Sequence, residues 1–423
     1  MENTQTQVRN YQASGFYEKI VMSVLKRFQK GTLNLTLPSG ESFFIGDGEG
    51  LKVDLTINNR DFFKKFVLSG DVGFGESYCD GDWETTDLTK LVRWAIQNAE
   101  TSGVISGSKV KDLSVNLLGQ VNKISHLFNR NSKTGSRSNI SFHYDLSNDF
   151  YEMMLDETMS YSCGIFEDEN TDLKAAQIKK LEMLCHDLDI QDGDHILEIG
   201  CGWGGFAVHA VTNFNCEVTG VTISQAQYDY ARERVKRLGL EDKITIILKD
   251  YRDLDGQYDK VVSVEMIEAV GHEYLPEYFE TINRLLKKEG VAVIQAITSP
   301  DSRYDMFRKG VDFIQKHIFP GSLLPSVGAM TKACEKTDLH LHNLRDIGLH
   351  YSKTLRIWDE KVEAQRGKIE ELGMDEIFFR KWKYYLCYCE AAFQERNISD
   401  VQIVLIKPNN IRYRDNHDMI SNT

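Results

Sequence analysis

Short apolar segments alternate with helical segments from about residue 141 onward, and this rhythm restricts the fold more than any other feature of the chain. Strands that alternate with helices form βαβ units, which build a doubly wound, mostly parallel sheet. The sequence therefore predicts an α/β domain over residues 141–423, with a helical insertion over 299–345 before a late strand, VQIVLIKP. The earlier apolar segments are HILEIG, CEVTGVT, KITIILKD, YDKVVSVEM and GVAVIQAIT.

Two further regions precede the α/β domain. Residues 1–102 contain an amphipathic segment, FYEKIVMSVLKRF, then two alternating segments, GTLNLTLPSG and ESFFIGDGEGLKVDLTI, and a helical tail, DLTKLVRWAIQNAE. Paired strands beside helices predict a small α+β domain. Residues 103–140 form a connector with ends of flexible composition around one amphipathic helix, residues 115–128.

The distribution of charge distinguishes the kinds of partner. A formal net charge of −13 argues against nucleic acid, because phosphate contacts need a cationic surface. Residues 104–143, in contrast, carry six basic residues against the single acid Asp112. Beside the apolar face of the 115–128 helix, these charges favour docking on a phospholipid membrane surface, although a solvated linker or an interdomain helix fits the same composition. The basic residues are Lys109, Lys111, Lys123, Arg130, Lys133 and Arg137.

The same chain gives an expectation about its compartment. No apolar run approaches the roughly 20 residues that cross a bilayer, and the first residues lack the apolar core of a signal peptide. The eight cysteines include no C-x-x-C pair, so neither a zinc site nor a disulfide framework is expected. We therefore expect a cytoplasmic protein, without a metal, that associates peripherally with the inner face of the membrane.

The segment LEIGCGWGGF, residues 197–206, fits two nucleotide-binding patterns. Gly200, Gly202 and Gly205 satisfy G-x-G-x-x-G, which is typical of a dinucleotide site. Glu198 and Gly204, with the first two glycines, satisfy E-x-G-x-G-x-G, which is typical of an S-adenosylmethionine site. The glycines alone do not choose between the two, and they also fit a turn that binds nothing.

The ends of the following strands distinguish the ligands. A dinucleotide site needs an acid about 20 residues further on, to hold a ribose hydroxyl. The second strand instead ends in GVTISQAQ, which has Thr222, Ser224 and Gln227 but no carboxylate. Asp250 and Tyr251 end the third strand, where an adenine could stack and form hydrogen bonds. These residues favour S-adenosylmethionine over a nicotinamide cofactor.

Three longer segments together resemble the cyclopropane-fatty-acyl-phospholipid synthase family. They are HYDLSNDFYEMMLDETMSYSCGIF (143–166), VVSVEMIEAVGHEYLPEYF (261–279) and GLHYSKTLRIW (348–358). The similarity extends over residues 141–408 and, more loosely through FGESYCDGDWETTDL, into the N-terminal domain. It implies a class I methyltransferase fold with a seven-stranded sheet, a lipid-facing N-terminal domain and a possible homodimer.

The resemblance also implies a reaction. A methyl group passes from S-adenosylmethionine to the cis double bond of an acyl chain in a phospholipid, and the resulting carbocation loses a proton to close a cyclopropane ring. In the family a bound bicarbonate ion is the base. Such a site needs an apolar channel, aromatic faces near the cation and exclusion of water.

The resemblance assigns residues to both parts of this site. Glu268 would polarise the bicarbonate, and Tyr351 would donate a hydrogen bond to it. Considered without the family resemblance, Cys163 could equally be a small apolar side chain buried in the core, and Glu268 an acidic residue that stabilises the start of a helix. The implied catalytic set is Cys163, Glu268, Gln295, Ile297 through its backbone, and Tyr351. The cofactor set is Tyr144, Tyr161, Ser162, Glu198, Gly200, Gly202, Gly204, Thr222, Ser224, Gln227, Asp250 and Tyr251.

Two positions depart from the family pattern. Ala269 replaces a histidine found in many bacterial members, and Gln295 stands where the family's histidine ligand to bicarbonate falls. Glutamine can donate a hydrogen bond but cannot carry a proton, so the presence of the ion and the closure of a ring both stay open. The open alternatives are a methyl- or methylene-branched product, a methyltransferase for a small soluble molecule, a non-catalytic lipid-binding protein and, more distantly, a nicotinamide oxidoreductase.

The aromatic segment FFRKWKYYLCYCEAAF (378–393) favours core packing over a ligand cage.

Overall fold

The computed structural model describes residues 14–101 and 147–411, so the predicted connector over 103–140, with its basic residues, and Tyr144 lie outside the described residues. Within these ranges the chain divides into two compact units. The first unit holds residues 14–101, 309–318 and 363–397, and the second holds 147–308, 319–362 and 398–411. The units differ from the boundaries expected from the sequence, because two late segments pack with the N-terminal elements.

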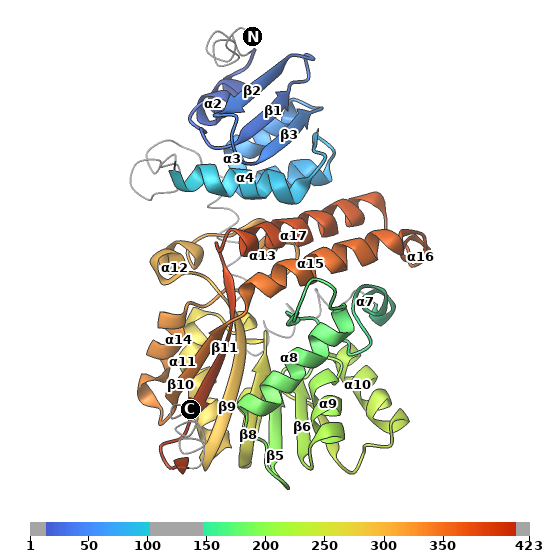
Figure 1. The fold of residues 1–423 in the computed structure, drawn as a ribbon, viewed down its shortest axis with the longest axis vertical. Helices are drawn as coiled ribbons and strands as arrows, with labels where there is room; N and C mark the ends of the chain where they lie inside the picture. Colours follow the sequence, from blue (N-terminus) through green and yellow to red (C-terminus); the bar gives the residue numbers. More distant parts are fainter. Residues whose placement is uncertain (1–13, 102–146, 412–423) are drawn as a thin grey trace. The chain divides into compact units, whose positions relative to one another are not determined.

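The first unit is a four-stranded sheet with helices, in agreement with the predicted α+β composition (Figure 1). Its strands follow the order β2-β1-β3-β4, in which β1 and β3 are parallel and the other pairs are antiparallel. The elements are α2 (Phe16–Leu25), β1 (Thr32–Thr36), β2 (Ser42–Gly46), β3 (Lys52–Ile57), α3 (Asp61–Cys79), β4 (Trp83–Glu84), α4 (Leu88–Thr101), α13 (Phe313–His317), α16 (Arg366–Glu371) and α17 (Glu376–Gln394).

Helix α17 supplies much of the aromatic core of the first unit. It packs against α3 and α4, and its Phe379, Trp382 and Tyr384 are buried. The ring of Tyr384 lies 4.5 Å from that of Phe313, measured between centroids. The segment FFRKWKYYLCYCEAAF therefore packs in a core, which confirms the interpretation that the sequence favours.

The second unit contains the predicted doubly wound sheet, with strand order β10-β11-β9-β8-β5-β6-β7. Strands β5 to β9 are parallel, whereas β11 is antiparallel to both of its neighbours. This is the strand order of a class I methyltransferase. The strands are β5 (His195–Ile199), β6 (Glu217–Thr222), β7 (Ile244–Leu248), β8 (Tyr258–Val264), β9 (Leu286–Thr298), β10 (His340–Asp346) and β11 (Ser399–Ile406).

Strand β10 lies almost entirely inside the segment expected to be a helical insertion. Its side chains are exposed or half-buried along its whole length, so it shows no apolar run that would mark it as a strand. Pairing with β11 at the edge of the sheet makes it the seventh strand. The remainder of that segment is helical in α12 (Asp301–Phe307), α13, α14 (Val327–Ala333) and a short turn at Cys334–Lys336.

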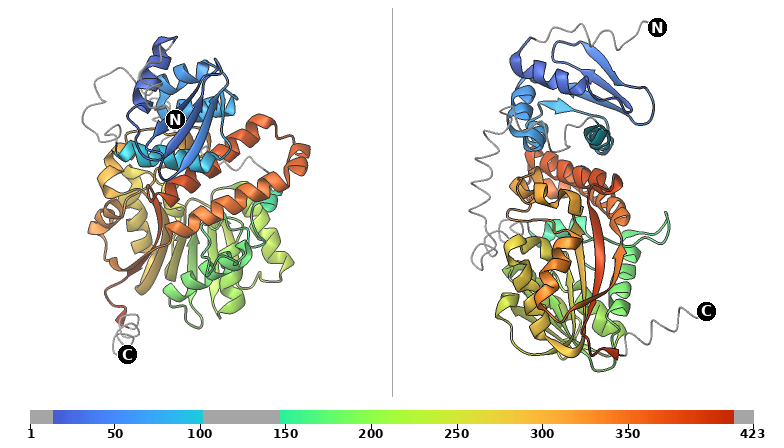
Figure 2. Two further views of the ribbon diagram at one scale, coloured as in Figure 1. Left: turned by 45° about the horizontal axis from the view of Figure 1, so that its top comes forward. Right: turned by 90° about the vertical axis from the view of Figure 1, so that its left-hand side faces the viewer.

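Alternate residues of the central strands face two separate cores of the second unit. Leu197 and Ile294 face a core shared with α11 (Leu275–Leu285) and α14, whereas Ile196 and Val293 face a core shared with the helices on the other side. Figure 2 shows the sheet edge-on between these layers. The other helices are α7 (Asn148–Met154), α8 (Leu173–Asp187), α9 (Gly205–Asn213), α10 (Gln225–Arg237) and α15 (Gly348–Ala364). None of the helices described here is long and apolar enough to cross a membrane.

Candidate active site

The carboxyl ends of β5 to β9 meet at one edge of the sheet, and the amino end of the antiparallel β11 reaches the same edge. Ligands of open α/β sheets bind at this edge. The predicted site residues on these strands lie there because each of them ends or follows a strand. Topology therefore assembles the site from segments that are far apart in the sequence.

The glycine motif forms the turn between β5 and α9. Gly200 and Gly202 both have positive φ, at 83° and 51°, which side chains with a Cβ rarely adopt. A Cβ at Gly200 would lie 2.8 Å from Met266 Cγ, whereas one at Gly202 would meet no atom of the described part of the chain within 4 Å. The turn therefore leaves open space beside Gly202, where the backbone can approach a ligand closely.

Glu198 lies at the end of β5 with only 4% of its surface exposed. Its Oε2 atom has no hydrogen-bond partner among the described residues. Burial raises the pKa of Glu198 to about 8, against the attraction of Lys180 and a backbone hydrogen bond from Ala207. A buried carboxyl with an unpaired oxygen beside the glycine turn suits a cationic ligand.

The ends of β6 and β7 bring the other predicted cofactor residues to the same edge. Thr222 donates to Gln227 Oε1 at 2.8 Å, and Ser224 caps α10 by accepting from the Gln227 backbone N–H. Asp250 binds the Arg252 guanidinium through both of its oxygens. Tyr251 lies edge-on to Tyr278, with 5.6 Å between ring centroids.

Tyr161 and Ser162 belong to the loop between α7 and α8. The Tyr161 ring lies 5.2 Å from that of Trp358 and 5.4 Å from that of Tyr151, so it belongs to an aromatic cluster. Ser162 is buried, and its hydroxyl accepts a hydrogen bond from Lys180 Nζ at 2.9 Å. The loop therefore presents aromatic faces, while Ser162 is held by α8.

The predicted catalytic residues converge on a carboxylate that the sequence reasoning missed. Glu265 follows β8, and its Oε1 accepts from the Cys163 backbone N–H at 2.9 Å and from Gln295 Nε2 at 2.8 Å. Its Oε2 accepts from Tyr351 Oη at 2.5 Å. Glu265 itself is partly exposed, although the side chains of Cys163 and Gln295 are fully buried. The sequence signal that could have identified Glu265 is its position directly after a strand.

Gln295 is oriented by a chain of side-chain hydrogen bonds. Arg345 can only donate, so Gln402 presents its oxygen to Arg345 and its amide nitrogen to Gln295, at 3.0 and 3.1 Å. Gln295 therefore presents its own nitrogen to Glu265 and, at 2.9 Å, to Asp400 Oδ2. Asp400 is the second catalytic-cluster residue that the sequence reasoning missed.

Glu268 lies in a short 3-10 turn after β8, and its Oε1 accepts a hydrogen bond from the Ile297 backbone N–H at 2.5 Å. Burial and then the charge of Glu265 raise the pKa of Glu268 to about 8. The thiol of Cys163 is completely buried, which raises its pKa well above its ordinary value. Cys163 is therefore a neutral thiol that contributes its backbone N–H.

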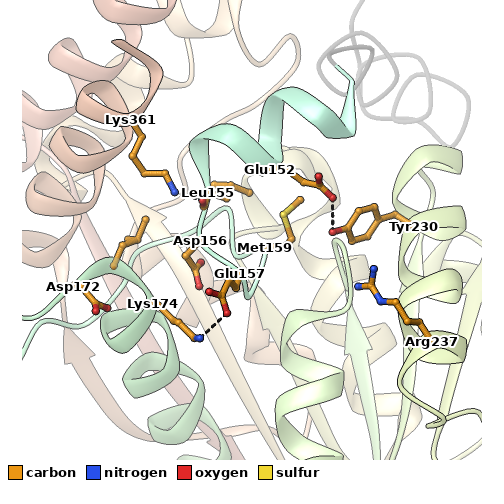
Figure 3. A pocket seen from close by; sticks show the side chains of 11 residues that line it. Glu152, Leu155, Asp156, Glu157, Met159, Asp172, Lys174, Tyr230, Arg237 and Lys361 are labelled. Atoms are coloured by element: carbon orange, nitrogen blue, oxygen red, sulfur yellow. Dashed lines mark hydrogen bonds and ion pairs between the residues drawn. The ribbon is translucent and has the colours of Figure 1, made fainter. Parts of the chain in front are cut away.

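A separate pocket of about 570 Å³ lies among α7, α8, α10 and the end of α15 (Figure 3). Four acidic and three basic side chains occur among its eleven lining residues, including Lys174 paired with Glu157. None of the predicted site residues that the structure describes lines this pocket. Its charged lining differs from the apolar channel that an acyl chain needs.

The strand order, the glycine turn and the site at the sheet edge define a class I methyltransferase. A family model described as mycolic acid cyclopropane synthetase matches residues 131–403. The chain is 40% identical to tuberculostearic acid methyltransferase UfaA1 of Mycobacterium tuberculosis, over 80% of this chain and 79% of that protein. It is 37% identical to cyclopropane-fatty-acyl-phospholipid synthase of Escherichia coli, over 83% and 87% of the two chains.

A solved structure gives the same result. The mycolic acid cyclopropane synthase CmaA1, in complex with SAH and CTAB, superposes with a TM-score of 0.60 at 30% identity, and it covers 64% of this chain and 98% of its own. The chain therefore belongs to the mycolic acid cyclopropane synthetase family, and it is an S-adenosylmethionine-dependent methyltransferase of the cyclopropane synthase type. The predicted fold and enzyme class are confirmed, and so is S-adenosylmethionine as the predicted methyl donor.

Proposed function

We propose that this enzyme transfers a one-carbon unit from S-adenosylmethionine to the cis double bond of an acyl chain in a membrane phospholipid, with closure of a cyclopropane ring. One observation carries the proposal: an acidic cluster lies at the same sheet edge as the glycine turn, with Glu268 and Asp400 buried and Glu265 partly exposed. An amine needs no such cluster, because its lone pair attacks directly. An alkene does need a base, since the cation that it forms must lose a proton.

The residues at the sheet edge fit S-adenosylmethionine, which supplies an electrophilic methyl group when bound. The open turn at Gly202 and the unpaired Oε2 of Glu198 are the features that accept it. Aromatic side chains, Tyr161 and Tyr351 among them, offer ring faces that stabilise a nearby cation by about 0.5–2 kcal/mol each. Buried surroundings protect such a cation from water.

The residues do not fit the bicarbonate ion that the family resemblance implies. The cage residues Cys163, Gln295 and Tyr351 already direct their donors to the Glu265 carboxylate. The Ile297 N–H is directed to Glu268. We therefore derive no step through bicarbonate.

A branched product is the second candidate. The 40% identity with a protein named tuberculostearic acid methyltransferase and the presence of Gln295 in place of histidine favour it. In that reaction the cation gives a methyl- or methylene-branched chain instead of a ring. Both candidates place the same alkene beside the same methyl donor.

Mass spectrometry of lipids from cells that express the chain tests the proposal. A gain of one CH₂ unit on unsaturated acyl chains supports it, and NMR of the product separates ring from branch. Cells that express the Glu268→Gln variant are the comparison, and we expect less product from them because Glu268 holds the Ile297 backbone at the end of β9. Unmodified lipids, together with methylation of a small soluble amine by the purified enzyme, would refute the proposal.

We also propose that the enzyme docks on the phospholipid surface through the basic residues between 104 and 143, which lie outside the described residues. Each basic residue near anionic lipid contributes about 1 kcal/mol at low ionic strength. Charge reversal at Lys109, Lys111 and Lys123 should therefore weaken binding to anionic vesicles, and unchanged binding at low salt would reject the idea. A homodimer stays a prediction, which sedimentation of the purified protein can test.

A further inference from the structure

The environment of Glu265 combines three hydrogen-bond donors from three separate parts of the chain. They are the Cys163 backbone N–H, the Gln295 amide and the Tyr351 hydroxyl, at 2.9, 2.8 and 2.5 Å. A carboxylate is the species that accepts three such bonds at once. Three residues that the family resemblance assigns to a bound anion thus surround an anion that belongs to the protein.

We propose that Glu265 is the general base of the reaction and that its carboxylate takes the place of bound bicarbonate. The inference rests on the proposed function, because it names the group that receives the proton. It goes beyond that function because an internal base removes the need for a dissolved ion. Glu265 is therefore a catalytic residue that the family-based assignment does not contain.

Neighbouring groups favour ionisation of Glu265 over its two acidic neighbours. Burial raises the pKa of all three carboxyl groups, but hydrogen bonds from Tyr351 and Cys163 and the charge of Lys180 oppose the rise at Glu265. The charge of Glu265 in turn raises the pKa of Asp400 further. When the three carboxyl groups together have lost one proton, the resulting negative charge therefore lies on Glu265.

The backbone at Glu265 positions the carboxylate toward the strand ends. Its φ of 48° is unusual for a residue other than glycine, and its N–H donates to the Gln295 carbonyl at 2.9 Å. This conformation occurs directly after β8 ends at Val264, before the 3-10 turn that carries Glu268. The Glu265 residue remains partly exposed, whereas Cys163, Gln295 and Tyr351 are buried, so a substrate at the strand ends can approach Glu265.

The proposed step balances in atoms and electrons. The π pair of the alkene forms the bond to the incoming methyl carbon, while the carbon–sulfur bond breaks and its electron pair stays on sulfur. A C–H bond of the added methyl group then breaks, and its pair bonds to the cationic carbon and closes the ring. The proton goes to a carboxylate oxygen of Glu265, which becomes neutral and later releases the proton to solvent.

Rate measurements with the full-length enzyme and dioleoyl-phosphatidylglycerol vesicles test this assignment. In buffer freed of carbon dioxide, we expect the wild-type rate to stay within twofold of the rate with added bicarbonate. Glu265→Gln keeps the shape but removes the base, so we expect a loss of at least about 100-fold, the lower range for general base catalysis. Glu268→Gln should cost less than Glu265→Gln, and Glu233→Gln, an exposed acid on α10, is the control.

A second variant separates a chemical role from a structural one. Glu265→Ala frees the three donors and leaves space, so we expect bicarbonate or formate to restore its rate at least tenfold. Carbon-13 NMR of labelled bicarbonate should show binding to Glu265→Ala and none to the wild type. Calorimetric titration with S-adenosylmethionine should give similar affinities for all variants, which shows that they remain folded.

Two results would overturn the inference. One is bicarbonate binding to the wild type or a wild-type rate that depends on the ion, and the other is a Glu265→Gln rate within tenfold of the wild type. A wild type that binds S-adenosylmethionine but modifies no lipid would refute the proposed function instead. The carbon-13 experiment needs no turnover, so it still decides whether Glu265 occupies the anion site.

Discussion

Replacement of Glu198 by glutamine should stabilise the unliganded protein at neutral and alkaline pH. The folded protein raises the pKa of this carboxyl from its ordinary value of 4.5 to about 8. Between these two values the unfolded chain loses the proton while the folded chain keeps it, so stability falls as the pH rises through this window. Glutamine has nearly the same shape and does not titrate, so the variant escapes this loss.

The size of the effect follows from the two pKa values. One pKa unit corresponds to about 1.4 kcal/mol, so the carboxyl costs about 3 kcal/mol at pH 7 and about 5 kcal/mol above pH 8. Below pH 4.5 the carboxyl is neutral in both states, and the cost disappears. The Oε2 atom has no hydrogen-bond partner within residues 14–101 and 147–411, so the amide of glutamine breaks no hydrogen bond to that part of the chain.

Urea unfolding at pH 4.5, 7 and 8.5 measures this prediction. The difference in the free energy of unfolding between Glu198→Gln and the wild type should grow with pH, while Glu233→Gln, an exposed acid, should show no such growth. The same Glu198→Gln protein should bind S-adenosylmethionine more weakly, because it cannot offer a negative charge to a cation. A difference that is equal at all three pH values would refute the reasoning about burial.

Two further predictions concern the turn and the hydrogen-bond chain behind Gln295. Gly200→Ala should lose more stability than Gly202→Ala. Both substitutions cost about 1–2 kcal/mol because an alanine must adopt a positive φ. Only the new Cβ at Gly200 clashes with Met266, which costs about 1–3 kcal/mol more through overpacking. Urea unfolding compares them, and equal losses would contradict the clash. Arg345→Met should lower kcat about tenfold, which corresponds to the free energy of one ordinary hydrogen bond, with little change in KM. The reason is that Gln402 loses the donor that orients its amide. Partial recovery in Arg345→Lys would support orientation as the cause, whereas an unchanged kcat would contradict it.

Local sequence patterns predicted the parts of the fold that rest on apolar periodicity. The six strands of the second unit with buried side chains are all visible as apolar segments, and in five of them burial on both faces demands such residues. Strand β7 has one buried residue but is still rich in isoleucine. The edge strand β10 has no buried side chain, so no pattern marks it. The same limit applies to the unit boundaries, since nothing local to residues 363–397 shows that they pack with α3 and α4.

The candidate site also contains some residues that sequence motifs identify and others that only the fold brings together. Motifs identified the glycine turn and, through the family resemblance, Cys163 and Tyr351. Glu265 follows a strand and looks like any exposed acid in sequence, because only the fold brings the three donors to it. Asp400 was equally hidden, since its place at the sheet edge depends on β11 running antiparallel to β9.

The interleaving of the two units has a practical consequence for dissecting this enzyme. The chain passes from one unit to the other several times, so no single cut separates them. A fragment that begins at residue 141 would retain α17 and α13 but lose α3 and α4, leaving Tyr384 and Phe313 without the surfaces that bury them. Such a fragment would be prone to aggregate, and its inactivity would say nothing about whether the N-terminal region takes part in recognising the lipid.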